Sequence, residues 1–257
     1  MLMLALVPQP AEAGRSCSER ALGLAEMEQA IATAARLHRT LETSGAELVL
    51  LARVGSDISE YGLKYTHAGL APRQADGSWR VTHQLNSCGS ARSALYNHGL
   101  LEFMLDDPHR YDVLVARPTP ALQAALIRQL DSGGPKQLHE PAYNMIAYPD
   151  GEMRFQNSNQ WVLEALTQAQ AGLRGETIAT RHQARDFYRR QGFRGSEISI
   201  PPLQRLFGGF RANLRFDDHP DDALRRGRFE VVSVRALIDH MNRTGMLDRT
   251  LEIHAPG

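Results

Sequence analysis

Two strand-like runs joined by a short turn constrain the fold of this chain most. The runs are KYTHAGLAPR (residues 64–73) and SWRVTHQLN (residues 78–86), and the segment QADG between them is typical of a β-hairpin. Two strands joined by such a turn are antiparallel. Residues 46–55 and 111–118 have the character of further strands, and the run GRFEVVSV predicts another before a last helix. The sequence therefore predicts an antiparallel sheet.

Helical patterns precede, separate and follow these strands. Apolar residues recur near the helical period over residues 18–44, and further helical patterns follow Thr119, a natural N-cap, and begin near Ser158 and Glu176. The 257 residues show no repeat, low-complexity segment or long linker. We therefore predict a single α+β domain in which an antiparallel sheet packs on helices.

The charge balance excludes one class of partner. Lys and Arg number 29, Asp and Glu also number 29, and the formal net charge is zero. A dedicated nucleic-acid-binding protein would carry a basic surface instead. The basic runs at 187–194 and 224–228 are interpreted as solvated faces. We predict no nucleic-acid partner.

The first residues indicate export. MLMLALVPQPAEAG combines a short apolar run, a proline break and a small-residue cleavage pattern that ends at Ala13. Residues 1–13 are therefore predicted to be a signal peptide, and residues 14–257 a single exported domain in the periplasm or medium. The alternative is a floppy cytosolic N-terminus. Since no run reaches the roughly 18 apolar residues that a membrane span needs, no transmembrane segment is predicted.

The expected state of the only two cysteines, Cys17 and Cys88, depends on whether the protein is exported. In an oxidising compartment such a pair is most simply one disulfide, and here it would tie the N-terminal segment to the body of the domain. In the cytosol the same residues would be two free thiols.

Two histidines occupy matching places on the hairpin. His67 lies seven residues before the turn, and His83 lies six residues after it. Such positions are near neighbours in an antiparallel pair and face the same side if the register allows. A lone histidine on a strand is usually structural, whereas an opposed pair is less common and is a candidate site.

Ser158 opens a predicted helix on its buried side. Apolar residues recur after it at helical spacing, at Trp161, Val162, Ala165, Leu166 and Ala169. The simplest interpretation is a helix cap, made by Asn157 with Gln160 or by Ser158 itself. The other interpretation is a nucleophile, and this segment alone does not decide between the two.

The segments YTHAGLA, WRVTHQL and AYNMIAYPDGEMRFQNSNQWVLEAL together resemble the circularly permuted branch of the papain-like NlpC superfamily, which includes lecithin–retinol acyltransferase. That branch has a His-φ-Gly-φ strand, a second histidine on the next strand, and Asn-Cys-x-x-aromatic at the start of the nucleophile helix. Residues 67–70, His83 and residues 157–161 match these elements, except that Ser158 stands where the family has cysteine. The sequence as a whole also resembles a bacterial family of exported proteins of unknown function.

This resemblance implies a permuted papain-like core over about residues 46–170, with extra helices at both ends of the chain. Ser158 would be the nucleophile, His67 the general base and His83 its orienting partner, and backbone N–H groups at the helix start would hold the oxyanion. Tyr143 and Trp161 are candidates to contact the substrate. The implied activity is that of a hydrolase or acyltransferase acting on an amide, ester or thioester of a cell-envelope peptide, glycan or lipid, and no cofactor is implied.

Serine in place of cysteine keeps several alternatives open. A serine hydroxyl is far less acidic than a thiol and depends on a well-placed base, so the chain could be an inert relative that only binds an envelope ligand. Glu140 could assist the histidines. Cys88 could instead be a displaced nucleophile, or could join His67 and His83 in a zinc site, although the short ligand spacings typical of such sites are missing. No metal is predicted.

Overall fold

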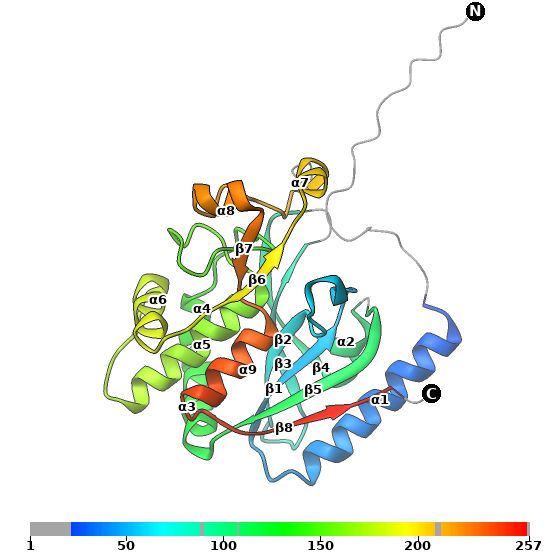
Figure 1. Cartoon of the computed structure of the whole chain (residues 1–257). Coiled ribbons are helices and arrows are strands. Elements are labelled where there is room, and N and C mark those ends of the chain that lie inside the picture. Colours follow the sequence, from blue (N-terminus) through cyan, green and yellow to red (C-terminus); the bar gives the residue numbers. More distant parts are fainter. Residues whose placement is uncertain (1–21, 88–89, 107, 209–211, 256–257) are drawn as a thin grey trace, which may run out of the picture.

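An antiparallel sheet lies at the centre of the molecule (Figure 1). The computed structural model describes residues 22–87, 90–106, 108–208 and 212–255, and within them this sheet has six strands in the order β4-β3-β2-β1-β5-β8. Every neighbouring pair of strands is antiparallel. Strands β2 and β3 are joined by a single residue pair, Leu70 with Thr82. The strands are β1 (Leu48–Val54), β2 (His67–Pro72), β3 (Arg80–Asn86), β4 (Ser93–Gly99), β5 (Arg110–Pro118) and β8 (Leu247–Ile253). The predicted α+β class is confirmed.

Helices cover both faces of this sheet. One face packs against α3 (Pro120–Ser132), α5 (Ser158–Leu173) and α9 (Val234–Arg243), and the opposite face packs against α1 (Leu24–Glu42) and α2 (Leu100–Leu105). Successive residues of β1 alternate between the two apolar cores, Leu48 and Leu50 on the α5 side and Val49 and Leu51 on the α1 side. This alternation is the period-two pattern of a strand buried on both faces, and it explains why β1 reads as one continuous apolar run.

The remaining elements lie outside the central sheet and the helices that cover it. They are the short helices η1 (Ser59–Tyr61), α4 (Gly134–Gln137), α6 (Arg181–Arg190), α7 (Pro202–Gly208) and α8 (Asp221–Arg226), and a separate antiparallel pair, β6 (Ser196–Ser199) with β7 (Arg228–Val231). In Figure 1 this pair and α7 and α8 form a group above the central sheet.

Helix α5 is buried on all sides. Each of its residues from Ser158 to Ala171 is buried, because the sheet lies on one side and α3, α6 and the loop before the helix lie on the others. Trp161 is in this core: it has no exposed surface, and its indole N–H donates to the Pro135 carbonyl at 3.0 Å. The predicted apolar face is therefore confirmed, although the polar face is buried as well.

The structure differs from the sequence prediction at the two edges of the sheet. Residues 93–99 form strand β4, which the sequence analysis did not predict, and the chain returns after α9 to add β8 beside β5. Five of the six strands lie within the predicted core of residues 46–170, and the sixth comes from the far end of the chain. The last segment thus contributes a strand in addition to the expected helix.

Two predictions concern residues outside the described part of the chain. The proposed signal peptide (1–13), Cys17 and Cys88 all lie outside it. The disulfide stays a prediction, and the intact mass after alkylation with and without reductant tests it. Among the described residues, no helix is both long and apolar enough to cross a membrane.

Candidate functional site

Ser158, His67 and His83 lie in one line of hydrogen bonds. The Ser158 Oγ is 3.0 Å from His67 Nδ1, and His67 Nε2 is 2.8 Å from His83 Nδ1. All three residues are buried, Ser158 being 4% exposed and His67 7%. Residues from a helix and two strands thus meet in the order that the sequence predicted.

The register of the hairpin brings the two histidines together. Leu70 pairs with Thr82, so His67 and His83 are displaced by two residues from direct opposition and lie on the same face of the sheet. Gly69 makes the approach possible. A Cβ atom at this position would lie 2.6 Å from Val81 Cγ1 and 3.0 Å from the Cβ of His83, which is closer than carbon atoms pack. The glycine beside His67 is therefore needed for β3 to lie this near.

Asn157 caps helix α5 and leaves Ser158 available to His67. The Asn157 side chain accepts a hydrogen bond from the Gln160 backbone N–H at 2.8 Å. Ser158 is then the first residue of the helix, and its hydroxyl contacts a histidine instead of the backbone. Within the described residues, no carbonyl accepts from the backbone N–H of Ser158 or Asn159. The positive end of the helix dipole and these N–H groups meet at the same place, which favours an anion there.

A third histidine, which the sequence analysis missed, extends the line. His83 Nε2 is 3.1 Å from Nδ1 of His98, a half-buried residue of β4. Val81 pairs with His98, so His83 and His98 are again displaced by two residues on the same face. The imidazoles of three adjacent strands therefore form one row that ends at Ser158. The alternation of buried and exposed residues that would have revealed β4 is weak in its sequence.

Phe103 and Arg53 form the wall behind this row. The Phe103 ring centroid lies 5.9 Å from that of His67 and 5.2 Å from that of His83, and the Arg53 guanidinium carbon lies 5.4 Å from the Phe103 centroid. Asp106 holds the Arg53 guanidinium through its carboxylate and its carbonyl. Burial, followed by the positive charge of Arg53 and the neighbouring His98, lowers the pKa of His83 to about 3. His83 is therefore neutral at physiological pH.

The other predicted site residues lie elsewhere. The Glu140 carboxylate accepts from the Ala142 backbone N–H at 3.0 Å and holds its own loop. Tyr143 is half-buried on the strand-like segment that pairs with Gln156, two residues before Ser158. Trp161 was predicted to contact substrate, but a ring with no exposed surface packs the core instead, so that prediction is corrected.

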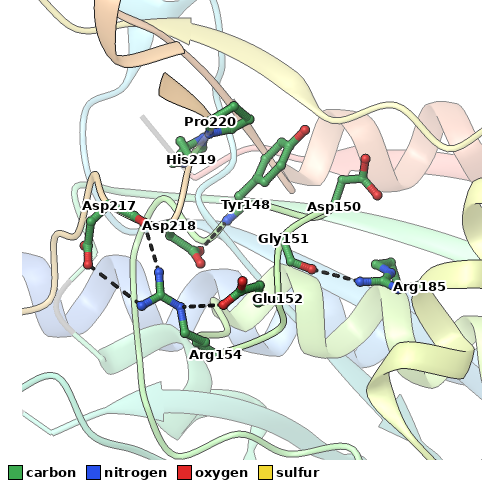
Figure 2. Close-up of a pocket in the computed structure, with 10 residues that line it drawn as sticks. All are labelled: Tyr148, Asp150, Gly151, Glu152, Arg154, Arg185, Asp217, Asp218, His219 and Pro220. Carbon is green, nitrogen blue, oxygen red and sulfur yellow. Dashed lines mark hydrogen bonds and ion pairs between the residues drawn. The ribbon is translucent and has the colours of Figure 1, made fainter. Parts of the chain in front are cut away.

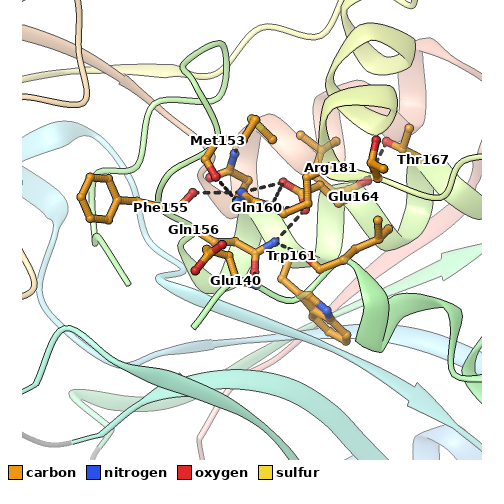
Figure 3. Close-up of polar contacts among 12 residues, drawn as sticks. Glu140, Met153, Phe155, Gln156, Gln160, Trp161, Glu164, Thr167 and Arg181 are labelled. Carbon is orange, nitrogen blue, oxygen red and sulfur yellow. Dashed lines mark hydrogen bonds and ion pairs between the residues drawn. The ribbon is translucent and has the colours of Figure 1, made fainter. Parts of the chain in front are cut away.

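A buried ion pair anchors the loop that leads into α5 (Figure 3). Arg181 Nε lies 2.9 Å from a carboxylate oxygen of Glu164, and the same guanidinium donates to the carbonyls of Met153 and Phe155. Gln156 Nε2 also donates to Glu164, at 2.7 Å. Although Arg181 opposes the effect, burial raises the pKa of Glu164 to about 7. These contacts fix the four residues before the Asn157 cap, and hence the place where Ser158 begins the helix.

A hollow lies between the loop before α5 and the loop before α8, away from the row of histidines (Figure 2). It has a volume of about 480 Å³ and polar walls. Arg154 contacts Glu152 and Asp217, and Asp218 accepts from the Tyr148 backbone N–H at 2.8 Å. Most of its charged side chains are already paired with neighbouring groups of the protein, so we interpret this hollow as a polar contact between two loops.

Ser158, His67 and His83 together can activate a hydroxyl. A nucleophile within reach of a base, and a base held by a third group, is the pattern of covalent catalysis. Among the described residues, no group of three His, Cys, Asp or Glu side chains is arranged to hold a metal ion.

Comparison with known proteins gives a family and no activity. No curated protein and no solved structure matches this chain. One family model, described as an uncharacterized protein conserved in bacteria (DUF2145), matches residues 40–241, a range that contains Ser158 and all three histidines of the row. The chain belongs to this bacterial family.

Proposed function

We propose that this protein is a hydrolase or acyltransferase that cleaves an amide, ester or thioester, with Ser158 as nucleophile, His67 as general base and His83 as the residue that orients His67. The proposal rests on the unbroken contact from Ser158 Oγ through His67 to His83. Residues 91 positions apart in the sequence meet here at hydrogen-bond distance. A helix cap needs no such partner, and the backbone N–H that a cap would bind is already held by Asn157.

The proposed reaction has two balanced halves. Ser158 Oγ bonds to the substrate carbonyl carbon while its proton passes to His67 Nδ1, and the carbonyl oxygen becomes an oxyanion. When the intermediate collapses, the bond to the leaving group breaks and that group departs with the proton from His67. Water or an acceptor hydroxyl then attacks the acyl-enzyme, gives its proton to His67, and Ser158 recovers the proton as the acyl group leaves.

The start of α5 supports the oxyanion in this scheme. The backbone N–H groups of Ser158 and Asn159 are free of carbonyl partners among the described residues, and they lie beside the reacting hydroxyl at the positive end of the helix. Donors placed where negative charge develops are usually the largest single contribution to catalysis of this kind.

The order of the elements supports the resemblance to the permuted papain-like proteins. A strand with His67 and Gly69 comes first, a strand with His83 second, and a helix that opens with Asn157 and Ser158 last. Since relatives of that kind act on cell-wall peptides or lipids, we propose an envelope peptide, glycan or lipid as the substrate, in the periplasm or outside the cell. Tyr143, close to the start of α5, stays a candidate for contact with it.

One observation favours a second function. Ser158 and His67 are both less than a tenth exposed, and serine is a weaker nucleophile than the cysteine of the resembling proteins. An inert relative that binds an envelope peptide, glycan or lipid beside these residues, without reacting with it, fits the same observations.

A thiol at position 158 separates the two functions. In Ser158→Cys, the helix start and His67 should lower the thiol pKa, so iodoacetamide should alkylate it faster than an ordinary thiol. Replacing His67 by Asn in that variant should remove most of the excess rate. Peptide mapping by mass spectrometry assigns the label to residue 158 and excludes Cys17 and Cys88.

Ser233 provides a matched control. It is also a buried serine at a helix start, but its hydroxyl accepts from the Ala236 N–H and contacts Ser196 instead of a histidine. If Ser158→Cys reacts no faster than Ser233→Cys, the enzyme proposal fails and the binding module becomes the better interpretation. If it reacts faster, a fluorophosphonate probe on the unmodified protein, with Ser158→Ala as its blank, tests whether serine itself is reactive.

A further inference from the structure

The hydrogen bonds along the row of imidazoles can run in either of two directions, and only one of them leaves His67 able to act as a base. When each ring carries one N–H and one lone pair, three rings linked nitrogen to nitrogen have two self-consistent proton arrangements. In the forward arrangement Ser158 donates to His67 Nδ1, His67 Nε2–H donates to His83, and His83 Nε2–H donates to His98 Nδ1. In the reverse arrangement every proton sits on Nδ1, and His67 donates to Ser158. Only the forward arrangement leaves His67 able to take the Ser158 proton.

We propose that His98 is a positioning residue that sets the forward direction, by accepting the hydrogen bond from the buried Nε2–H of His83. The inference deepens the proposed function and rests on it, because the direction matters only if His67 acts as a base. His98 touches no reacting atom. It acts on Ser158 through two intervening rings, at contacts of 3.1, 2.8 and 3.0 Å.

Because His83 is buried, the direction of the hydrogen bonds depends on whether residue 98 can accept from the His83 Nε2–H. His83 has no exposed surface, so water cannot accept from its Nε2–H in place of His98. With no acceptor at position 98, the forward arrangement would leave a buried N–H unsatisfied, and such donors are rarer in proteins than unsatisfied acceptors. The reverse arrangement, which leaves only a bare lone pair on His83 Nε2, would then gain.

The place of His98 suits this role. It lies on β4 at the edge of the sheet, is half-buried, and has the Tyr96 ring 5.5 Å from its own. It is the only ring of the row that is not buried, and the forward arrangement puts its remaining N–H on the nitrogen away from His83. The strand register that holds His83 against His67 holds His98 against His83 in the same way.

Two substitutions separate acceptance of the hydrogen bond from occupancy of the site. His98→Asn keeps an acceptor, because the amide oxygen stands the same number of bonds from the backbone as Nδ1. His98→Leu removes it. Nitrogen-15 NMR of the full chain reads the tautomer of each ring directly. We expect His67 and His83 to carry their protons on Nε2 in the wild type and in His98→Asn, and to shift towards Nδ1 in His98→Leu.

The same pair of substitutions should change reactivity at residue 158. In the Ser158→Cys background we expect alkylation to slow roughly tenfold with His98→Leu, the factor that an unsatisfied buried donor produces, and to change less than threefold with His98→Asn. His182→Leu, a histidine exposed on α6, is the matched control and should leave both readouts unchanged.

The tautomers decide the inference even if the proposed function fails. A wild-type His83 protonated on Nδ1 would overturn it, as would equal tautomers in the Leu and Asn variants. If the thiol at residue 158 is unreactive in every variant while the tautomers behave as expected, the hydrogen-bond direction stands and the enzyme proposal alone is lost. Should His98→Leu not fold, His98→Ala removes the same acceptor and takes its place, and a wild-type His83 protonated on Nδ1 would overturn the inference without either variant.

Discussion

Replacing Gly69 by alanine should both destabilise the protein and disconnect the two histidines. The new Cβ would lie 2.6 Å from Val81 Cγ1, 3.0 Å from His83 Cβ and 3.1 Å from the Thr82 carbonyl oxygen. Carbon atoms pack at about 3.5–4.0 Å, so the shortfall against Val81 is about 1 Å. The Val81 side chain is stiff at χ1, and the other two atoms belong to the backbone and to Cβ, so β3 itself must move.

Overpacking of this kind costs about 1–3 kcal/mol. For a chain of this size the melting temperature should fall by about 2–12 °C, and urea denaturation should show a lower free energy of unfolding at an unchanged m value. Because the displaced strand carries His83, alkylation of Ser158→Cys should slow in the same variant.

Gly172→Ala makes the same chemical change with the opposite expectation. Gly172 lies near the end of α5, and a Cβ there would meet only the Gln129 amide at 3.8 Å. Alanine favours a helix over glycine, so this variant should gain up to about 0.5 kcal/mol. If Gly69→Ala melts like the wild type and leaves the thiol reactivity unchanged, the close approach of β2 and β3 around the histidines is refuted.

Three further predictions follow from single contacts. Asn157→Ala should cost about 1 kcal/mol of unfolding free energy through loss of the cap, whereas Thr119→Ala should cost little because the Thr119 side chain caps nothing; equal losses would contradict the assigned caps. Arg181→Met should cost about 3–5 kcal/mol because the buried Glu164 must then take up a proton and the carbonyls of Met153 and Phe155 lose their donor, whereas Arg190→Met on the same helix, from an exposed pair, should stay within about 0.5 kcal/mol in urea melts. His83 has a pKa of about 3 when folded, below its unfolded value, so the unfolded chain binds the proton first as pH falls and stability is lost below about pH 6.5. Between that pH and about 3 the wild type should lose up to about 1.4 kcal/mol per pH unit more than His83→Asn, and parallel curves would show that folding does not lower the pKa of His83.

The inner strands and the pairing of His67 with His83 could be predicted from the sequence because local patterns encode them. The turn between residues 73 and 78 fixes an antiparallel pair, and counting outwards from it places His67 and His83 side by side. The apolar spacing after Ser158 defines a helix, and Asn157 marks its first turn. The pairing of the histidines needed only the geometry of one turn. Ser158 entered the candidate site through the resemblance to the permuted papain-like proteins, because its own segment fits a helix cap equally well.

The two edge strands could not be predicted from the sequence, and His98 was missed because it lies on one of them, β4. Strand β8 is mostly exposed and β4 has one buried residue, and both carry polar residues, as edge strands often do to avoid pairing with other chains, so neither shows an apolar pattern. The Arg181–Glu164 pair was missed for another reason. Glu164 lies on the polar side of α5, which an amphipathic pattern assigns to solvent, and only the packing of α6 over that side buries it.

The electrostatics of the row explain why serine chemistry here would be slow without being absent. In a Ser-His-Asp triad a carboxylate offsets the charge that the histidine gains, and replacing it by an amide costs about 10⁴ in rate. Here the ring behind His67 is the neutral His83, and the burial and the Arg53 cation that lower the pKa of His83 also oppose positive charge nearby. Binding and an oxyanion site alone still retain about 10³–10⁴ over water in such enzymes. We therefore expect Ser158 to react with an activated phosphonate over hours, where an ordinary serine hydrolase reacts within minutes. A thiol at the same position needs less help from the base and should react far faster. A large ratio between the two rates would indicate that the weak base, and not the position of residue 158, limits the reactivity of Ser158.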